Sequence, residues 1–258
     1  MVDAIKKWLA HAATRDLSID DPRTTQRRRS IIEGNRFLWR IYDEWYRAIA
    51  ARVPEGPGRV LELGSGAGFL AKYLPGLIAS EVFPCPGLNV VLDARQLPFA
   101  DASLKAIVMV DVFHHIPDSR AFLKEADRCL RPGGSIVMVE PWVSSWSRLI
   151  YGHLHHEPFV PDAADWSFPS SGPLSGANGA LPWIIFERDR AKFQREFPGL
   201  AIRAVEPSMP FRYLVSGGVS MRPLMPETLF PLWTKLDSWF GAWRSAWPMF
   251  ALVHLIKR

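Results

Sequence analysis

VLELGSGAGFL, at residues 60–70, is the most informative segment of this 258-residue chain. An apolar, β-rich run ends at Gly64, and Gly66 and Gly68 follow at alternate positions before a segment that we predict to be helical. Glycines at such a point let the chain turn sharply out of a strand and let a ligand approach the backbone closely. The strand before the glycines and the helix after them predict a ligand-binding turn in an α/β sheet.

Apolar runs and turns surround this segment. The predicted strands are Leu77–Phe83, Asn89–Leu92, Leu104–Val112 and Ser135–Glu140, with a helix over Ser119–Leu130. Apolar strands separated by helices and tight turns are typical of a parallel sheet with helices on both faces. The fold class is therefore predicted to be α/β, with a Rossmann-like doubly wound sheet.

The flanks complete one predicted domain over residues 1–258. Its parts are a helical N-terminal cap (1–57), the cofactor-binding core (58–141), a Trp-rich lid insertion (142–181) and the C-terminal part of the sheet (182–258). Within the flanks the predicted helices are Ser30–Arg52, Pro182–Phe197 and Pro231–Trp247, and the predicted strands are Leu200–Val205, Phe211–Val215 and Phe250–Lys257. A long irregular stretch such as 142–181 is usually a lid or a binding loop.

The composition is that of an ordinary globular protein, with 48% apolar and 22% charged residues and a formal net charge of +5. Cys85 and Cys129 are the two cysteines, which excludes a disulfide framework and fits a reducing compartment. No apolar run reaches the ~18 residues of a crossing helix, and no secretory apolar core is visible near residue 1. We therefore expect a cytoplasmic protein. The basic run at residues 27–29 lies among acidic neighbours, so a solvated helix face is favoured and no nucleic-acid partner is expected.

Acidic residues accompany the glycine turn. Glu62 stands two places before the first glycine, and Phe69 takes the position at which dinucleotide enzymes have a further glycine. A carboxylate at this point repels a pyrophosphate, whereas it favours an adenosine ligand that carries a sulfonium and an ammonium group. Glu81 ends the second predicted strand, where a carboxylate accepts both ribose hydroxyls. Asp93 follows the third, where a carboxylate accepts the adenine amino group and the N–H of Ala94 reaches the ring.

Three segments together resemble the class I S-adenosylmethionine-dependent methyltransferases, in their small-molecule branch. They are VLELGSGAGFL, LDARQLPFADASLKAIVMVDVFHHIPD and FLKEADRCLRPGGSIVMVEP. The resemblance is close over residues 58–141. It implies a sheet of about seven strands whose last strand is antiparallel, which Phe250–Lys257 supplies.

The same resemblance implies a cofactor site for S-adenosylmethionine, with S-adenosylhomocysteine as product. The implied cofactor-binding residues are Glu62, Gly64, Gly66, Gly68, Glu81, Asp93, Ala94 and Asp111. The glycine turn and Glu62 hold the methionine part, Glu81 the ribose, and Asp93 with Ala94 the adenine. Asp111, at the end of the fourth strand, lies beside the sulfonium.

Methyl transfer from a sulfonium is an in-line displacement, and alignment alone supplies up to about 7–11 kcal/mol. A general base adds about 10²–10⁴-fold and is needed only for an acceptor that is protonated at neutral pH. His114 and His115 end the fourth predicted strand, and His155 and His156 lie in the predicted lid. These four histidines are the candidate bases.

A metal site is the alternative use of the histidine-rich lid segment. His153 and His156 have helical i, i+3 spacing and Glu157 is adjacent. Since no cysteine lies nearby and no second cluster completes a tetrahedron, no metal is expected.

The Pro231–Trp247 segment places its leucines, tryptophans and Phe240 on one broad face, with Asp237 on the other. Core packing is favoured, with some tryptophan left to line an apolar pocket, while an interfacial helix in peripheral contact with a membrane is the alternative. We predict methyl transfer to a small, apolar or lipid-like acceptor. The alternatives are an RNA or protein methyltransferase, a non-catalytic S-adenosylmethionine-binding protein and, more distantly, a nicotinamide oxidoreductase. The sequence makes no prediction of the oligomeric state.

Overall fold

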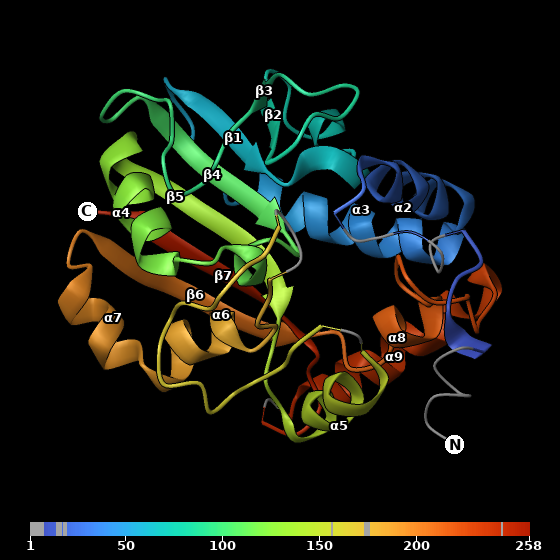
Figure 1. Ribbon diagram of the computed structural model, residues 1–258. Helices are drawn as coiled ribbons and strands as arrows, with labels where there is room; N and C mark the ends of the chain where they lie inside the picture. The colour runs from blue at the N-terminus through green and yellow to red at the C-terminus, as the bar shows by residue number, and fades with distance from the viewer. Residues whose placement is uncertain (1–7, 14–16, 18–19, 156, 173–175, 244) are drawn as a thin grey trace.

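The computed structural model describes residues 8–13, 17, 20–155, 157–172, 176–243 and 245–258, and it is built around one seven-stranded sheet (Figure 1). The strands are β1 (Arg59–Leu63), β2 (Ile78–Glu81), β3 (Val90–Val91), β4 (Leu104–Val110), β5 (Leu130–Pro141), β6 (Leu200–Ser208) and β7 (Phe250–Lys257). Their order across the sheet is β3-β2-β1-β4-β5-β7-β6. β7 runs antiparallel to β5 and β6, and the pairs from β3 to β5 are parallel. This arrangement confirms the predicted sheet and its antiparallel last strand.

Helices and single turns connect these strands. The helices are α2 (Pro22–Gly34), α3 (Arg36–Ala50), α4 (Ser119–Cys129), α5 (Ser145–Leu154), α6 (Leu181–Trp183), α7 (Arg190–Glu196), α8 (Arg212–Ser216) and α9 (Phe230–Gly241). The short turns are η1 (Ser65–Ala67), η2 (Leu70–Lys72), η3 (Phe113–His115), η5 (Glu227–Leu229) and the π-helical η4 (Ile184–Arg188).

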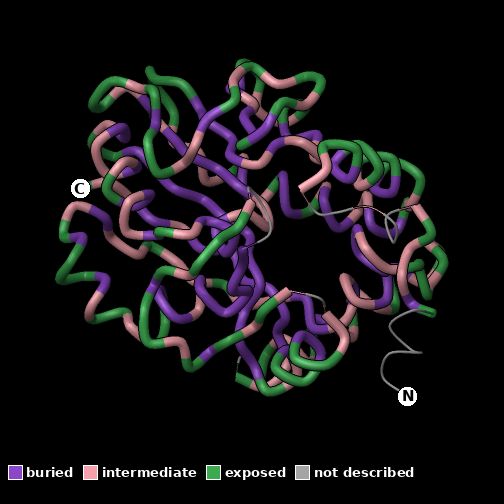
Figure 2. Tube along the Cα trace, viewed as in Figure 1, coloured by how far each residue is buried: buried purple, intermediate pink, exposed green. Residues whose placement is uncertain are grey.

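Both faces of the sheet are covered. Successive strand residues point to opposite faces, so Ile107 packs in one apolar cluster with α4 and α7, and Val108 in a second cluster with α3. Figure 2 shows the central strands buried, while the outer faces of the helices are exposed. The sheet is therefore a middle layer, and its strand ends provide the ligand edge.

Some predicted elements differ from the observed ones. The predicted Ser30–Arg52 helix is wrong as one element, because it is parts of two helices, α2 and α3, that meet at Asn35. The N–H of Asn35 bonds Ile31 at the end of α2, and its side chain accepts the N–H of Leu38 at the start of α3. One asparagine thus caps both helices.

The helical segment predicted after the glycine turn forms only the 3₁₀ turns η1 and η2. The predicted strand Phe211–Val215 is wrong, because these residues enter helix α8. There the carboxylate of Asp237 accepts the N–H of Phe211 at 2.8 Å and pairs with Arg212 at 2.7 Å. Tertiary contacts of this kind override local β propensity.

The predicted Pro182–Phe197 helix is interrupted by the π turn η4, and the predicted Pro231–Trp247 helix ends at Gly241. The favoured core packing of the second helix is wrong for much of its aromatic face. Trp239 is 72% and Trp243 68% exposed, while Asp237 is buried. The salt bridge to Arg212 draws the polar side of α9 inward and leaves these tryptophans outside.

Candidate functional site

A cavity of about 620 Å³ lies where β1, β2 and β4 end. Glu81, the last residue of β2, lines it together with Gly64 and Asp111, which directly follow β1 and β4. In a parallel sheet the carboxyl ends of the strands are the usual ligand site, and the volume lies within the range of about 300–1,000 Å³ for small-molecule pockets. This cavity is the candidate active site.

Steric contacts within the protein require glycine at two positions of the turn. Gly64 has φ +67°, and a Cβ there would collide with Cγ2 of Val112. A Cβ on Gly68 would collide with the hydroxyl of Tyr46. The glycines therefore let η3 and α3 approach the end of β1, and Gly64 also lines the cavity.

The predicted cofactor residues fall into two groups. Gly64, Glu81, Asp93, Ala94 and Asp111 line the cavity. Glu62, Gly66 and Gly68 do not line it, and they lie in or beneath the turn.

Glu62 is a buried carboxyl group with 5% of its surface exposed. Burial, together with the charge of Glu81, raises the pKa of Glu62 to about 7, although a hydrogen bond from Ser65 opposes the rise. The Ser80 hydroxyl donates to the backbone carbonyl of Glu62 at 2.6 Å. The turn thus follows directly on a buried carboxyl group whose pKa is raised.

Replacing Glu62 with glutamine is expected to stabilise the ligand-free protein at high pH. Because the pKa of Glu62 is higher in the folded than in the unfolded chain, folding retains the proton, and stability falls as the pH rises from 4.5 to about 7. Removing the ionisable group should raise the free energy of unfolding by up to about 3 kcal/mol near pH 8, and by almost nothing near pH 4. Urea unfolding at both pH values measures this, and an equal effect at the two would contradict it.

Glu81 is held at the cavity edge by backbone donors. Its two carboxylate oxygens accept the N–H of Gly66 at 3.3 Å and its neighbour Val82 at 3.1 Å. Burial raises the pKa of Glu81, while these amides oppose the rise. The side chain is therefore oriented in advance of any ligand.

Asp93 has a partner that the sequence analysis did not consider. Arg95 forms an ion pair with it at 2.6 Å, and hydrogen bonds from Arg95 lower the pKa of Asp93. Ala94 lies between them and lines the cavity. An adenine amino group would therefore meet a carboxylate that is already shared with a guanidinium.

Asp111 sits in a strained backbone position next to the cavity. Its φ is +61°, which non-glycine residues rarely adopt. Burial raises its pKa to about 6, despite the opposing charge of His114. Strain and a perturbed carboxyl together are typical of functional sites.

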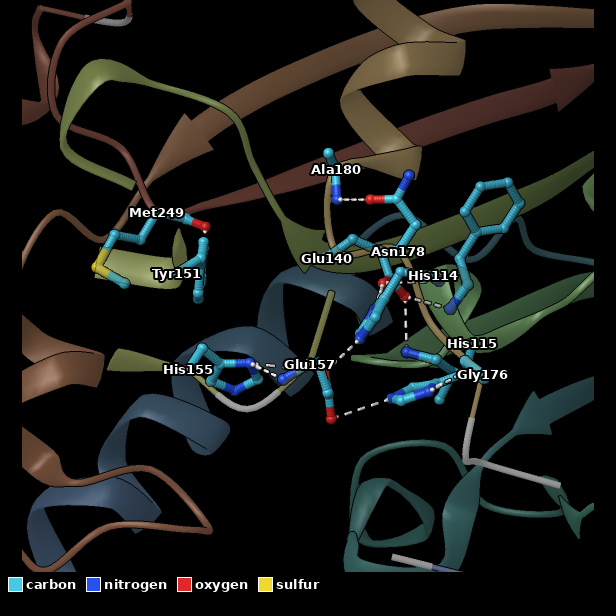
Figure 3. A network of polar contacts seen from close by, with 12 residues as sticks. His114, His115, Glu140, Tyr151, His155, Glu157, Gly176, Asn178, Ala180 and Met249 are labelled. Carbon is cyan, nitrogen blue, oxygen red and sulfur yellow. Dashed lines mark hydrogen bonds and ion pairs between the residues drawn. The ribbon is translucent and has the colours of Figure 1, made fainter. Parts of the chain in front are cut away.

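A polar network joins η3 to His155 and Glu157, which follow α5 (Figure 3). Nδ1 of His114 lies 2.7 Å from Glu140, and its Nε2 lies 3.4 Å from Glu157. Nε2 of His115 lies 3.6 Å from the same carboxylate. His155 Nδ1 is 3.9 Å from it. Glu157, His115 and His155 line the cavity, His114 lies behind them, and His156 is outside the described residues.

The carboxylates set the charge of the two adjacent imidazoles. Burial alone would lower the pKa of His114, but hydrogen bonds with Glu140 and Glu157 raise it well above its usual value. Burial and the neighbouring His114 lower the pKa of His115 to about 4. Burial opposes ionisation of Glu157, yet the hydrogen bond with His114 holds its pKa well below the ordinary range. His115 is thus neutral at pH 7, with a lone pair for chemistry.

Sequence reasoning missed Glu140 as a site residue. It is fully buried and accepts the N–H groups of Val112 at 2.9 Å and Phe113 at 2.7 Å, besides binding His114. An acidic residue inside the apolar run of a central strand was the available signal, since carboxylates are almost never fully buried without partners.

Arg28 was also missed, because residues 27–29 were predicted to form a solvated helix face. That prediction is wrong for Arg28: it lines the cavity, and its buried Nε has no hydrogen-bond partner within the described part of the chain. Tyr42 lines the cavity as well, whereas Tyr46 packs on the glycine turn. The expectation of tryptophan in the pocket is wrong, since no tryptophan of the described residues lines it.

Residues 61–138 match the family model described as a methyltransferase domain. Residues 61–138, from β1 into β5, therefore form a methyltransferase domain. The chain is similar in fold to geranyl diphosphate C-methyltransferase from Streptomyces coelicolor, solved with Mg²⁺, geranyl-S-thiolodiphosphate and S-adenosyl-L-homocysteine. That likeness has a TM-score of 0.52 and 11% identity, and it covers 86% of this chain and 78% of the other.

Two curated relatives match part of this chain by sequence. The phthiotriol/phenolphthiotriol dimycocerosates methyltransferase of Mycobacterium tuberculosis is 34% identical in an alignment of length 113, which covers 37% of this chain and 42% of that protein. The ubiquinone/menaquinone biosynthesis C-methyltransferase of Geotalea daltonii is 31% identical in an alignment of length 120, which covers 43% of this chain and 46% of that protein. The chain thus matches less than half the length of these relatives.

Proposed function

We propose that this protein transfers a methyl group from S-adenosylmethionine to a small, apolar or lipid-like acceptor. The observation that carries the proposal is the cavity itself. It has acidic groups suited to a nucleoside at the ends of β2 and β3 and apolar walls from α5 and α8. The acidic and the apolar regions belong to one cavity, which Gly64 of the methyltransferase domain also lines.

The cofactor site is proposed on the residues that line the cavity. Glu81, already oriented by backbone amides, accepts the ribose hydroxyls. Asp93 and the N–H of Ala94 take the adenine. Asp111 faces the sulfonium, and the buried carboxyl of Glu62 beneath the turn favours the same positive ligand.

Arg28 is proposed to bind the carboxylate of the methionine part. Replacing Arg28 with glutamine is expected to weaken S-adenosylmethionine binding by about 10–100-fold, since a charge-assisted hydrogen bond is worth about 1.5–3 kcal/mol. Arg27→Gln is the matched control, because Arg27 is the exposed neighbour on the same helix. Calorimetry of both variants measures the difference, and an equal loss in the two would contradict the assignment.

The acceptor is proposed to occupy the apolar side of the cavity. Its walls there are Ile150 and Leu154 of α5, Leu214 of α8, and Met249. Apolar walls with a few polar groups are typical of sites for small apolar ligands. The names of the two curated relatives point to lipid-like and quinone-type products, which supports the same class of acceptor.

The chemistry asks mainly for alignment of acceptor, methyl carbon and sulfur. His115 is the proposed base for an acceptor that must lose a proton, because it is neutral and lines the cavity. His155 is a second candidate at the cavity wall. His114 is less suited, since both of its nitrogens face carboxylates.

The test is calorimetry with S-adenosylmethionine and S-adenosylhomocysteine, followed by an acceptor screen with labelled methyl donor. Binding of both ligands and label transfer to an apolar acceptor are expected. Binding without product across the screen would favour a non-catalytic binding protein. Salt-sensitive RNA binding with label on RNA would favour an RNA methyltransferase, and failure to bind either ligand would overturn the proposal.

Peripheral membrane contact through α9 is proposed as the route to a lipid-like acceptor. Trp239 and Trp243 are exposed, and Leu149 on the neighbouring α5 is 52% exposed. Backbone hydrogen bonds from residues 145 and 146 to residues 245 and 246 hold α5 beside this segment. Exposed aromatics of this kind insert at lipid interfaces. Within the described residues no helix is both long and apolar enough to cross a bilayer.

A double variant with serine at both Trp239 and Trp243 is expected to bind phosphatidylglycerol-containing vesicles about 10-fold or more weakly. Each substitution removes apolar side-chain area that would enter the lipid interface. Val91→Ser, an exposed apolar position on edge strand β3, is the control. Vesicle co-sedimentation measures both. Equal binding by the tryptophan variant and the wild type would contradict the contact.

A further inference from the structure

Three metal-ligating side chains converge on one wall of the cavity. His114 and His115 come from η3, and Glu157 comes from the segment after α5 (Figure 3). One ligand atom from each residue lies within 4.8 Å of the others. Two of the separations are 3.4 and 3.6 Å, from the two Nε2 atoms to the Glu157 oxygens.

These separations suit a shared ion. Zn–N and Zn–O bonds of about 2.0–2.1 Å at tetrahedral angles put neighbouring ligand atoms about 3.3 Å apart. The His115–Glu157 separation of 3.6 Å is too long for a direct hydrogen bond. A small inward movement of the three side chains around an ion meets the required geometry.

The Nδ1 atoms of the two histidines make the contacts that are typical of metal-ligating histidines. Nδ1 of His114 is bound by the buried carboxylate of Glu140 at 2.7 Å, and Nδ1 of His115 by the carbonyl of Gly176 at 3.2 Å. Metal-ligating histidines almost always donate their other ring N–H to a carboxylate or a backbone carbonyl, which fixes tautomer and ring orientation. Here both rings turn Nε2 toward Glu157.

The charge of the cluster also favours a bound cation. Glu140 is completely buried and Glu157 is largely buried, with 13% of its side chain exposed. Burying two carboxylates is costly unless cations compensate them. Without an ion, protonated His114 supplies one positive charge to the two carboxylates. A divalent ion in place of the proton on its Nε2 supplies two.

We propose that His114, His115 and Glu157 bind a divalent transition-metal ion of the zinc class. Two imidazoles and one carboxylate suit such ions, whereas Mg²⁺ prefers an all-oxygen shell. His115 and Glu157 line the cavity, so the remaining coordination position faces it. That position takes an oxygen atom of water or of the acceptor. A bound ion uses the Nε2 lone pair of His115, so in the metal-bound protein the role of base passes to His155, the second candidate at the cavity wall. The metal site does not depend on the proposed methyl transfer, and only its role toward the acceptor rests on that function.

Sequence spacing did not show this site, because Glu157 lies far from the histidine pair in the sequence. The alternative metal ligands in the sequence were His153, His156 and Glu157. In the structure the His153 ring bonds the Leu149 carbonyl at 2.9 Å within α5. Folding instead brings Glu157 to the histidine pair at the end of β4, some 42 positions earlier in the chain.

The test is a zinc titration of the full chain, freed of metal with EDTA, in the absence of S-adenosylmethionine. One Zn²⁺ per chain is expected, with an apparent Kd of about 1 µM or tighter, and Mg²⁺ is expected to bind at least about 100-fold more weakly. Co²⁺ should give visible absorption bands of a low-coordinate nitrogen and oxygen site. The absence of stoichiometric Zn²⁺ binding by the folded wild type would overturn the proposal.

Ligand variants locate the ion. His115→Ala and Glu157→Gln are each expected to weaken Zn²⁺ binding by about 100-fold or more, and Glu140→Gln by about 10–100-fold through the orientation of His114. His153→Ala is the control and should bind as the wild type does. Circular dichroism confirms that each variant is folded, and Glu157→Gln preserves side-chain size. Zn²⁺ binding that survives in both folded ligand variants would overturn the assignment.

Metal binding and methyl transfer are measured in separate assays, so that failure of one proposal can be told from failure of the other. A chain that binds Zn²⁺ at these residues but transfers no methyl group supports the site and contradicts the proposed function. Methyl transfer that is unchanged after EDTA treatment contradicts the role of the ion toward the acceptor.

Discussion

Replacing Gly64 with alanine is expected to lower the free energy of unfolding by about 2–5 kcal/mol. The left-handed backbone of Gly64, with φ +67°, costs an alanine about 1–2 kcal/mol. The added Cβ would collide with Cγ2 of Val112, and over-packing of this kind costs about 1–3 kcal/mol. Since globular proteins have only about 5–15 kcal/mol of stability in total, urea unfolding should show a large shift of the midpoint.

The same substitution is expected to weaken S-adenosylmethionine binding by about 100-fold or more, because any relief of the Val112 collision moves the turn at the cavity wall. Gly76→Ala is the matched control. Gly76 also has a positive φ, of +78°, but a Cβ there meets nothing within 4 Å. It should therefore lose about 1–2 kcal/mol of stability and keep its affinity. Equal effects of the two substitutions would show that steric contact at Gly64 is unimportant.

Replacing Glu140 with leucine is expected to lower the free energy of unfolding by about 3–5 kcal/mol. The buried carboxylate accepts two backbone N–H groups, from Val112 and Phe113, and pairs with His114. Leucine fills similar space but accepts no hydrogen bond, so it leaves buried donors without partners. Removing one partner of a buried ion pair adds the cost of an uncompensated charge. Urea unfolding in the presence of EDTA measures the loss without any contribution from bound metal.

An exposed glutamate on β6 provides the comparison. Glu206 pairs with Arg52 at 2.7 Å, and half of its side chain is exposed. Exposed pairs contribute about 0–1 kcal/mol, so Glu206→Leu should be nearly neutral. A loss for Glu140→Leu that is no greater than for Glu206→Leu would mean that η3 finds other acceptors once the carboxylate is gone.

Much of the sheet could be predicted from local sequence patterns. Strands buried on both faces are continuous apolar runs, and β1, β4 and β7 therefore stand out in the sequence at nearly their observed bounds. Because ligands bind at the carboxyl ends of parallel strands, the turn after β1 and the residues after β2 and β4 also predicted the side of the sheet where the cavity lies.

Helical boundaries followed less well, because they depend on caps and on partners far away in the chain. Asn35 divides one predicted helix into α2 and α3. Arg212 and Asp237, 25 positions apart, turn a predicted strand into α8 and rotate the polar side of α9 inward. A periodic pattern records which residues are apolar, and it carries no information about which buried charges will pair.

The site shows the same division. The glycines and the carboxylates at strand ends can be recognised from the local sequence, since few residue types tolerate a tight turn and a charge that ends an apolar run is conspicuous. The inward direction of Arg28, the burial of Glu140 and the approach of Glu157 to His114 arise only when distant segments pack together. The physical reason is that desolvation opposes the burial of a charged group, so a carboxylate such as Glu140 is buried only where partners compensate it, and these partners come from distant segments of the chain.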